Sequence, residues 1–264
     1  MGGALDSFGS FTRYFLQNER SNLEYLSYVM LIFGVQSFVL LQYFPSPYGR
    51  HGSSAWGFLV NGKFAWFTQE LPAFAIPVLL VVFADCPQLG ASSNRILLGL
   101  FLLHYFQRTF IYPMLIRGGK PTPFIPYTMA ISFCCANGYL QGRSLTRFVA
   151  YPKTWMTEPR VWIGMLLFFV GMGVNIHSDH ILMNLRKPGE TGYKIPKGGM
   201  FSFVSGANFL GEVIEWSGYA CACWNLPALA FACFTFLKPC STCHATPQMV
   251  QAGSLKITPR KEKP

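Results

Sequence analysis

Polar side chains stand at helical spacing inside stretches that are otherwise apolar. Asn175 and Asp179 are four residues apart, so they share a helix face, and a helix that continued to Arg186 would carry this base there too. Asn208 and Glu212 form a second pair with the same spacing. Carboxylates and amides can hold hydroxyl groups, while an arginine can hold a phosphate. These faces therefore predict a polar cavity, the alternative being structural polar contacts between packed helices.

Two further groups add to this pattern. Glu215 extends the second face by three residues, and His104 and Arg108 are again four apart with Tyr105 between them. Glu70 stands alone in another apolar stretch. Ionisable groups inside membrane-length apolar segments are costly, so they mark functional sites more often than surface charges do.

Metal chemistry is not expected. His177 and His180 flank Asp179, but the sequence supplies no evident third ligand. The segment from Cys240 to His244 matches the C-x-x-C-H pattern of haem attachment, yet it lies in a low-complexity tail. We therefore predict neither a metal site nor a haem.

The elements that carry these residues are membrane helices. Of the 264 residues, 51% are hydrophobic and only 12% are charged, about half of the charged share usual in soluble proteins. Stretches with no charge, or with one or two charges, have the length that spans a bilayer. They are 25–47, 64–82, 96–116, 121–142, 161–178, 201–216 and 216–237. The sequence predicts an all-α, polytopic membrane helix bundle with six to seven transmembrane helices.

The charge distribution indicates partners and boundaries. The formal net charge is +10, and the basic residues are scattered over loops, which favours lipid headgroups or an anionic cofactor over nucleic acid. Residues 238–264 contain five Lys or Arg, four Pro and no aromatic residue. We expect a membrane domain over 1–237 and a disordered basic tail over 238–264.

Several motifs, in order along the chain, resemble those of the steroid 5-alpha-reductases. The resemblance covers about residues 20–237, and parts of it are most similar to the type 1 isoform. The matching segments are Gln69–Pro72, His104–Thr109, Arg117–Pro121, Asn137–Gln141, Asn175–Leu182, Leu185–Gly189, Gly192–Pro196, Gly198–Gly199, Ala207–Glu212 and Glu215–Trp216.

This resemblance implies a seven-helix, multi-pass enzyme of the endoplasmic reticulum membrane. Such an enzyme uses NADPH to reduce the 4,5 double bond of 3-oxo-4-ene steroids, for example testosterone to dihydrotestosterone in androgen biosynthesis, and progesterone to dihydroprogesterone. It implies that Tyr105 donates a hydrogen bond to the 3-keto oxygen, with Glu70 as its partner. By the same resemblance Trp66 and Gln69 line the steroid pocket. The residues that would bind NADPH are Arg108, Lys120, Asn175, Asp179, Arg186, Tyr193 and Asn208.

Two departures from the family keep alternatives open. Met183 stands where the family has an arginine, and after Phe236 the chain does not follow the family's aromatic and basic terminus. One alternative is a catalytically impaired isoform that binds steroid or pairs with a full-length enzyme. Another is a related reductase that acts on polyprenol or enoyl-CoA chains.

Overall fold

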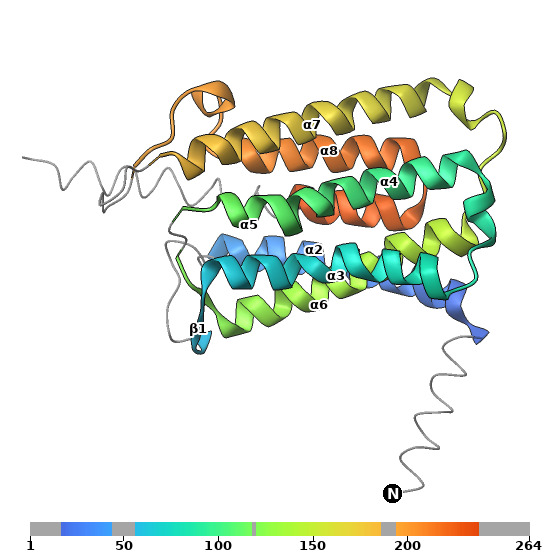
Figure 1. The fold of residues 1–264 in the computed structure, drawn as a ribbon, viewed down its shortest axis with the longest axis horizontal. Helices are drawn as coiled ribbons and strands as arrows, with labels where there is room; N and C mark the ends of the chain where they lie inside the picture. Colours follow the sequence, from blue (N-terminus) through green and yellow to red (C-terminus); the bar gives the residue numbers. More distant parts are fainter. Residues whose placement is uncertain (1–16, 44–55, 118–119, 186–193, 238–264) are drawn as a thin grey trace, which may run out of the picture.

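The computed structural model describes residues 17–43, 56–117, 120–185 and 194–237. In these ranges the helices run roughly along the long axis of the molecule as one bundle (Figure 1). They are α2 Glu19–Tyr43, α3 Gly62–Phe83, α4 Ser92–Phe106, α5 Tyr112–Leu115, α6 Phe124–Arg143, α7 Pro159–Met183, α8 Ala207–Cys223 and a last helix, Leu226–Leu237. The predicted all-α architecture is confirmed.

Short elements join or extend these helices. The π-helix η4, Gln107–Ile111, joins α4 to α5 as one continuous rod, and a second π-helix, η5 (Ser144–Phe148), extends α6. The described ranges thus contain seven helical rods. The connectors are the 3-10 helices η3 Pro87–Gly90, η6 Trp155–Thr157 and η7 Gly199–Ser202, and the antiparallel strands β1 Leu59–Val60 and β2 Thr122–Pro123, paired Leu59 to Pro123.

The outer surface is that of a membrane protein. Helices α2, α3 and α7 are each long and apolar enough to cross a bilayer. Large apolar side chains such as Phe83 and Leu166 are exposed on the outside of the bundle. Helix α3 also continues through Pro72 and Pro77, which membrane helices tolerate better than soluble ones.

Two predicted stretches are divided at the wrong residue. The sequence predicts spans over 201–216 and 216–237, but α8 begins at Ala207 and runs on to Cys223, and the chain turns at Trp224, whose φ of 48° is left-handed. The Asn225 side chain then accepts a hydrogen bond from the backbone N–H of Ala228 and caps the last helix. An uncharged run cannot reveal this turn, since both helices are apolar.

Helices α7 and α8 pack at backbone distance through four glycines. A Cβ on Gly171 would collide with the backbone of Glu215, and one on Gly164 would lie 2.6 Å from the Gly218 carbonyl oxygen. Gly211 makes the matching close approach from α8. Small residues allow such proximity between membrane helices, and here they bring the polar faces of α7 and α8 together.

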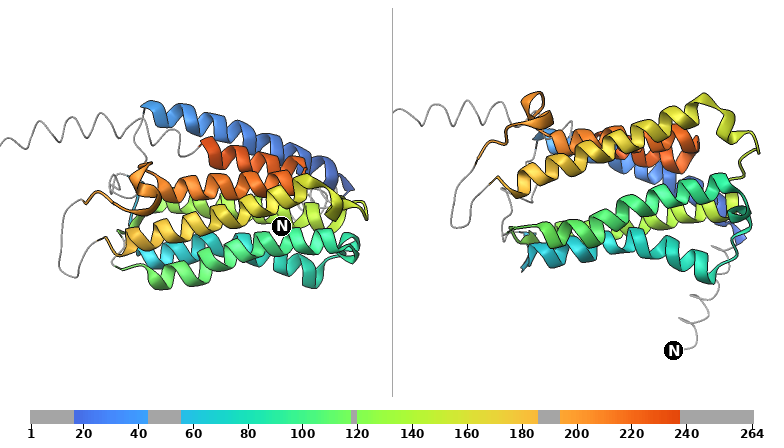
Figure 2. Two further views of the ribbon diagram at one scale, coloured as in Figure 1. Left: turned by 90° about the horizontal axis from the view of Figure 1, so that it is seen from above. Right: turned by 45° about the horizontal axis from the view of Figure 1, so that its top comes forward.

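The loop after η5 is fastened to the end of α8. Tyr151 donates a hydrogen bond to the Cys223 carbonyl oxygen (2.7 Å) and accepts one from the Asn225 side chain (3.1 Å). Burial raises the pKa of Tyr151, so its hydroxyl stays neutral. On the other side of the bundle the last helix lies beside α2 (Figure 2), where the rings of Phe33 and Phe234 stack 6.0 Å apart.

Candidate active site

Tyr105 and Glu70 both face α6. Tyr105 is 3% exposed, and its hydroxyl oxygen accepts a hydrogen bond from the Asn137 side-chain amide at 3.0 Å. Glu70 accepts a weak hydrogen bond from the Cys134 thiol at 3.9 Å. Cys134 and Asn137 are one helical turn apart on α6, so the structure brings Tyr105 and Glu70 to one face of that helix.

The Tyr105 hydroxyl is set up to donate. Its oxygen acts as the acceptor in the bond from Asn137, so its own hydrogen remains available for another acceptor. Gln141 holds Asn137 in turn, with its amide nitrogen 3.3 Å from the Asn137 side-chain oxygen. This chain of amides fixes which way the Asn137 amide points, and therefore the role of Tyr105.

Arg108 is the centre of a buried ionic network. Its Nη1 lies 2.6 Å from Asp179 Oδ2, and its Nη2 lies 3.5 Å from Glu212 Oε1. The arginine is only 7% exposed although it belongs to a membrane bundle. The pairs join the π-helix η4 to both α7 and α8.

Two asparagines complete the network. The Asn175 amide donates to the backbone carbonyl of Asn208 (3.0 Å) and lies 3.4 Å from Glu212 Oε1. The faces predicted from spacing on α7 and α8 are thus confirmed. Helix α7 ends at Met183, and the predicted third member of its face, Arg186, lies outside the described residues.

Aromatic rings close the other side of Arg108. The guanidinium carbon lies 4.7 Å from the Trp66 ring centre and 4.5 Å from that of Tyr112, so it makes a cation–π contact with each of two neighbouring rings. The Trp66 indole nitrogen is buried and has no hydrogen-bond partner among the described residues. Trp66 therefore connects α3 to the ionic network.

A histidine–carboxylate contact lies one helical turn before Arg108. His104 Nδ1 is 2.8 Å from Glu215 Oε1, and both side chains are buried. Glu215 Oε2 is without a partner in the described part of the chain, as is the hydroxyl of Ser178, which precedes Asp179. Unpartnered buried polar atoms are costly, so their concentration around Arg108 indicates a site that binds a polar ligand.

No polar contact with the Arg108 network is seen for the remaining predicted site residues in the described ranges. Gln69 is buried on α3, adjacent to Glu70, and Lys120 is exposed just before β2. Arg186 and Tyr193 lie outside the described residues.

Sequence reasoning missed two residues of the site and left a third without a role. Asn137 is an amide in an apolar helix, and Tyr112 follows Arg108 by four residues, so both carried a spacing pattern that was available. Glu212 was singled out by its spacing but was not assigned to the cofactor set, although it reaches Arg108 and Asn175.

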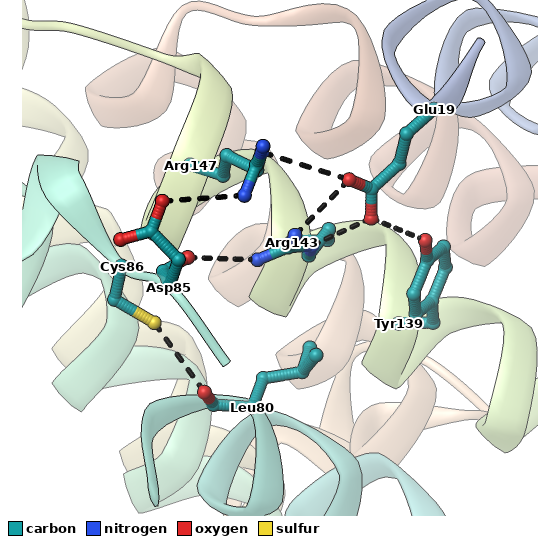
Figure 3. A network of polar contacts seen from close by, with 7 residues as sticks. All are labelled: Glu19, Leu80, Asp85, Cys86, Tyr139, Arg143 and Arg147. Atoms are coloured by element: carbon teal, nitrogen blue, oxygen red, sulfur yellow. Dashed lines mark hydrogen bonds and ion pairs between the residues drawn. The ribbon is translucent and has the colours of Figure 1, made fainter. Parts of the chain in front are cut away.

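Another buried network lies towards the opposite end of the bundle (Figure 3). The Glu19 carboxylate accepts hydrogen bonds from Tyr139 Oη (2.6 Å) and from Arg143 Nε and Nη2 (2.6 and 3.0 Å). Arg147 lies between Glu19 (3.7 Å) and Asp85 (3.4 Å). This network joins α2 to α6 and to the end of α3.

Comparison with known proteins places the chain among membrane steroid enzymes. A family model described as 3-oxo-5-alpha-steroid 4-dehydrogenase matches residues 120–252, a range that enters the segment where the sequence departs from the expected terminus. The chain is 50% identical over 220 residues to 3-oxo-5-alpha-steroid 4-dehydrogenase 1 of Bos taurus, covering 83% of this chain and 86% of that protein.

Human relatives give the same result. The chain is 48% identical over 218 residues to 3-oxo-5-alpha-steroid 4-dehydrogenase 1 of Homo sapiens, covering 83% of this chain and 84% of that protein. It is 51% identical over 193 residues to 3-oxo-5-alpha-steroid 4-dehydrogenase 2 of Homo sapiens, covering 72% and 75%. The similarity therefore covers the segments that carry Tyr105, Arg108 and Asp179.

Proposed function

Since this chain belongs to the 3-oxo-5-alpha-steroid 4-dehydrogenase family of oxidoreductases, we propose that it uses NADPH to reduce the 4,5 double bond of 3-oxo-4-ene steroids. Testosterone and progesterone are the substrates we infer, with dihydrotestosterone and dihydroprogesterone as products. We place the enzyme in the endoplasmic reticulum membrane, where its apolar helices face lipid.

The hydrogen bond from Asn137 to Tyr105 carries this proposal. Negative charge develops on the 3-keto oxygen when the conjugated double bond of an enone is reduced. A donor that is already oriented towards this oxygen stabilises the transition state more than the ground state. Tyr105 is such a donor, because Asn137 occupies its oxygen and leaves its hydrogen for the substrate.

Glu70 supports Tyr105 from α3. Its carboxyl group contacts Cys134, one turn of α6 away from the Asn137 that binds Tyr105. Both groups therefore meet the same face of α6. In the proposed reaction Glu70 orients the phenol and supplies its proton, while Tyr105 contacts the steroid oxygen. The apolar rings around Tyr105, including Phe101 and Trp216, exclude water from that contact.

The Arg108 network fits NADPH by the chemistry of its groups. Amides and carboxylates suit a carboxamide and ribose hydroxyls, an arginine suits phosphate, and the unpartnered Ser178 hydroxyl and Trp66 indole add donors beside them. When bound, the cofactor supplies the hydride. We infer that it is held by Arg108, Lys120, Asn175, Asp179, Arg186, Tyr193, Asn208 and Glu212.

Trp66 and Gln69 are the residues we infer for the steroid. They stand on α3 within one turn of Glu70, on the helix that also contacts α6. The Trp66 ring contacts the Arg108 guanidinium, so Trp66 can separate a bound steroid from the charged network. An apolar wall with few polar groups is typical of pockets for small apolar ligands.

A substrate and cofactor panel tests the proposal. The full chain, in membranes or lipid nanodiscs, is given NADPH or NADH with testosterone, progesterone, a polyprenol or an enoyl-CoA, and products are identified by mass spectrometry. The proposal predicts reduction of the two steroids with NADPH. Reduction of only the polyprenol or the enoyl-CoA would contradict the substrate class, and steroid binding without any product would indicate the impaired isoform.

A further inference from the structure

A groove of about 450 Å³ opens on the bundle, and none of the residues that line it belongs to the Arg108 network. It lies between the start of α3 and the segment formed by η4 and α5. Five of its seven lining residues are apolar. The lining residues are Lys63, Phe64, Phe67, Thr109, Phe110, Pro113 and Met114.

The two ends of the groove have different chemistry. Lys63 is exposed at the second residue of α3, and because α3 is a candidate membrane span, this end lies where lipid phosphates are found. No ion pair of Lys63 occurs in the described part of the chain. The anionic surface of a membrane attracts a lysine at this level, while the lysine stem lies along apolar surface.

Thr109 forms the closed inner wall of the groove. It is fully buried (0% exposed), so its hydroxyl is out of reach of a ligand in the groove. It lies about one turn from Pro113 on the same rod, next to the contact between the rings of Phe67 and Phe110 (6.0 Å). The lining that a ligand can reach beside Lys63 is therefore apolar, which suits an acyl chain behind a charged head.

We propose that the groove binds one anionic glycerophospholipid. Its phosphate pairs with Lys63, and an acyl chain lies along Phe64, Phe67 and Phe110. A neutral steroid would leave Lys63 without a counter-ion. The lipid stabilises the contact between α3 and α5, whose inner side holds Trp66 and Tyr112 (ring centres 5.0 Å apart).

Native mass spectrometry of the detergent-purified chain tests this site. Phosphatidylserine or phosphatidylcholine is added, and the fraction of protein that retains one lipid is measured. We expect a preference of about fivefold for phosphatidylserine, the size of one lysine's attraction to an anionic surface. K63Q should abolish this preference, whereas K153Q, which removes an exposed loop lysine, should keep it.

One more variant separates the site from ordinary lipid contact. M114W, which alters an exposed residue and so preserves the fold, should fill the groove and lower the retention of both lipids. Equal retention by K63Q and K153Q, or bound lipid that testosterone displaces from all variants alike, would overturn the proposal.

Discussion

Two buried arginine–carboxylate pairs with the same 2.6 Å separation hold different parts of the bundle. Arg143 binds Glu19 at the junction of α2 and α6, and Arg108 binds Asp179 between η4 and α7. Both arginines lie beside or within a π-helix that follows a long α-helix. The two pairs therefore share local structure and chemistry but differ in what surrounds them.

The Glu19 network is complete without a ligand. Both carboxylate oxygens accept hydrogen bonds, and Arg143 also donates to the Asp85 carbonyl oxygen at 3.0 Å (Figure 3). Around Arg108, by contrast, Ser178, Trp66 and Glu215 keep buried polar atoms without partners among the described residues. The difference suggests a general criterion: a satisfied buried network supports the fold, and an unsatisfied one is prepared for a ligand.

The largest expected effect is that of variants at Tyr105 and Glu70. Tyr105→Phe and Glu70→Gln should each lower turnover of testosterone by about a hundredfold to ten-thousandfold, because the donor to the 3-keto oxygen is lost or misplaced. NADPH affinity should change little. Turnover is measured in nanodiscs and affinity by cofactor fluorescence, with Tyr28→Phe and Glu24→Gln on exposed faces as controls. Unchanged turnover in both site variants would remove them from catalysis.

A substitution in the complete Glu19 network should lower the stability of the fold. Glu19→Gln leaves Arg143 buried without its counter-charge, which should cost about 3 kcal/mol of unfolding free energy. NADPH affinity of the folded fraction should stay within about twofold, because the partners of Glu19 are Tyr139, Arg143 and Arg147 and none of them belongs to the Arg108 network. Denaturant titration measures the first quantity. A large loss of NADPH affinity without loss of stability would contradict the assignment.

A substitution in the incomplete Arg108 network should lower the affinity for NADPH. Arg108→Lys keeps the charge but loses the planar fork that reaches both Asp179 and Glu212, so NADPH should bind about tenfold to a hundredfold more weakly. Arg95→Lys, which alters an exposed arginine on α4, is the matched control. Equal NADPH affinity in the two variants would place the cofactor elsewhere.

The smallest expected effect concerns the orientation of Tyr105. Asn137→Ala removes one neutral hydrogen bond, worth about 1 kcal/mol, and should lower kcat about fivefold while KM for NADPH stays constant. Ser132→Ala, on the exposed side of α6, should leave kcat unchanged. If both variants were equally active, Asn137 would be a packing residue only.

Much of the fold could be predicted because a bilayer imposes length and polarity on each helix. Composition was sufficient for the all-α bundle, and the uncharged stretches located most of the rods. The turn at Trp224 was missed because both flanking helices are uncharged, although Asn225 and Pro227 after it are residue types that start a helix. The π-helices were not predicted either, because i+5 hydrogen bonding depends on tertiary contacts of residues such as Arg108.

The site was partly visible for the same reason. Spacing grouped Asn175 with Asp179 and Asn208 with Glu212, since each pair lies within one helix. Which pair meets Arg108 depends on how helices pack, and the glycines that bring α7 against α8 become informative only in three dimensions. The partnership of Asn137 with Tyr105 likewise joins two helices that no sequence period connects.

Stabilisation by cofactor tests the contrast between the two networks most directly. A ligand that binds the folded state at a hundred times its dissociation constant stabilises it by about 2.7 kcal/mol. We predict that NADPH raises the unfolding temperature of the wild-type chain and of Glu19→Gln by similar amounts, and that Asp179→Asn shows a much smaller rise. A rise in Asp179→Asn equal to that of the wild type, or no rise in the wild type, would contradict the assignment of the Arg108 network as the cofactor site.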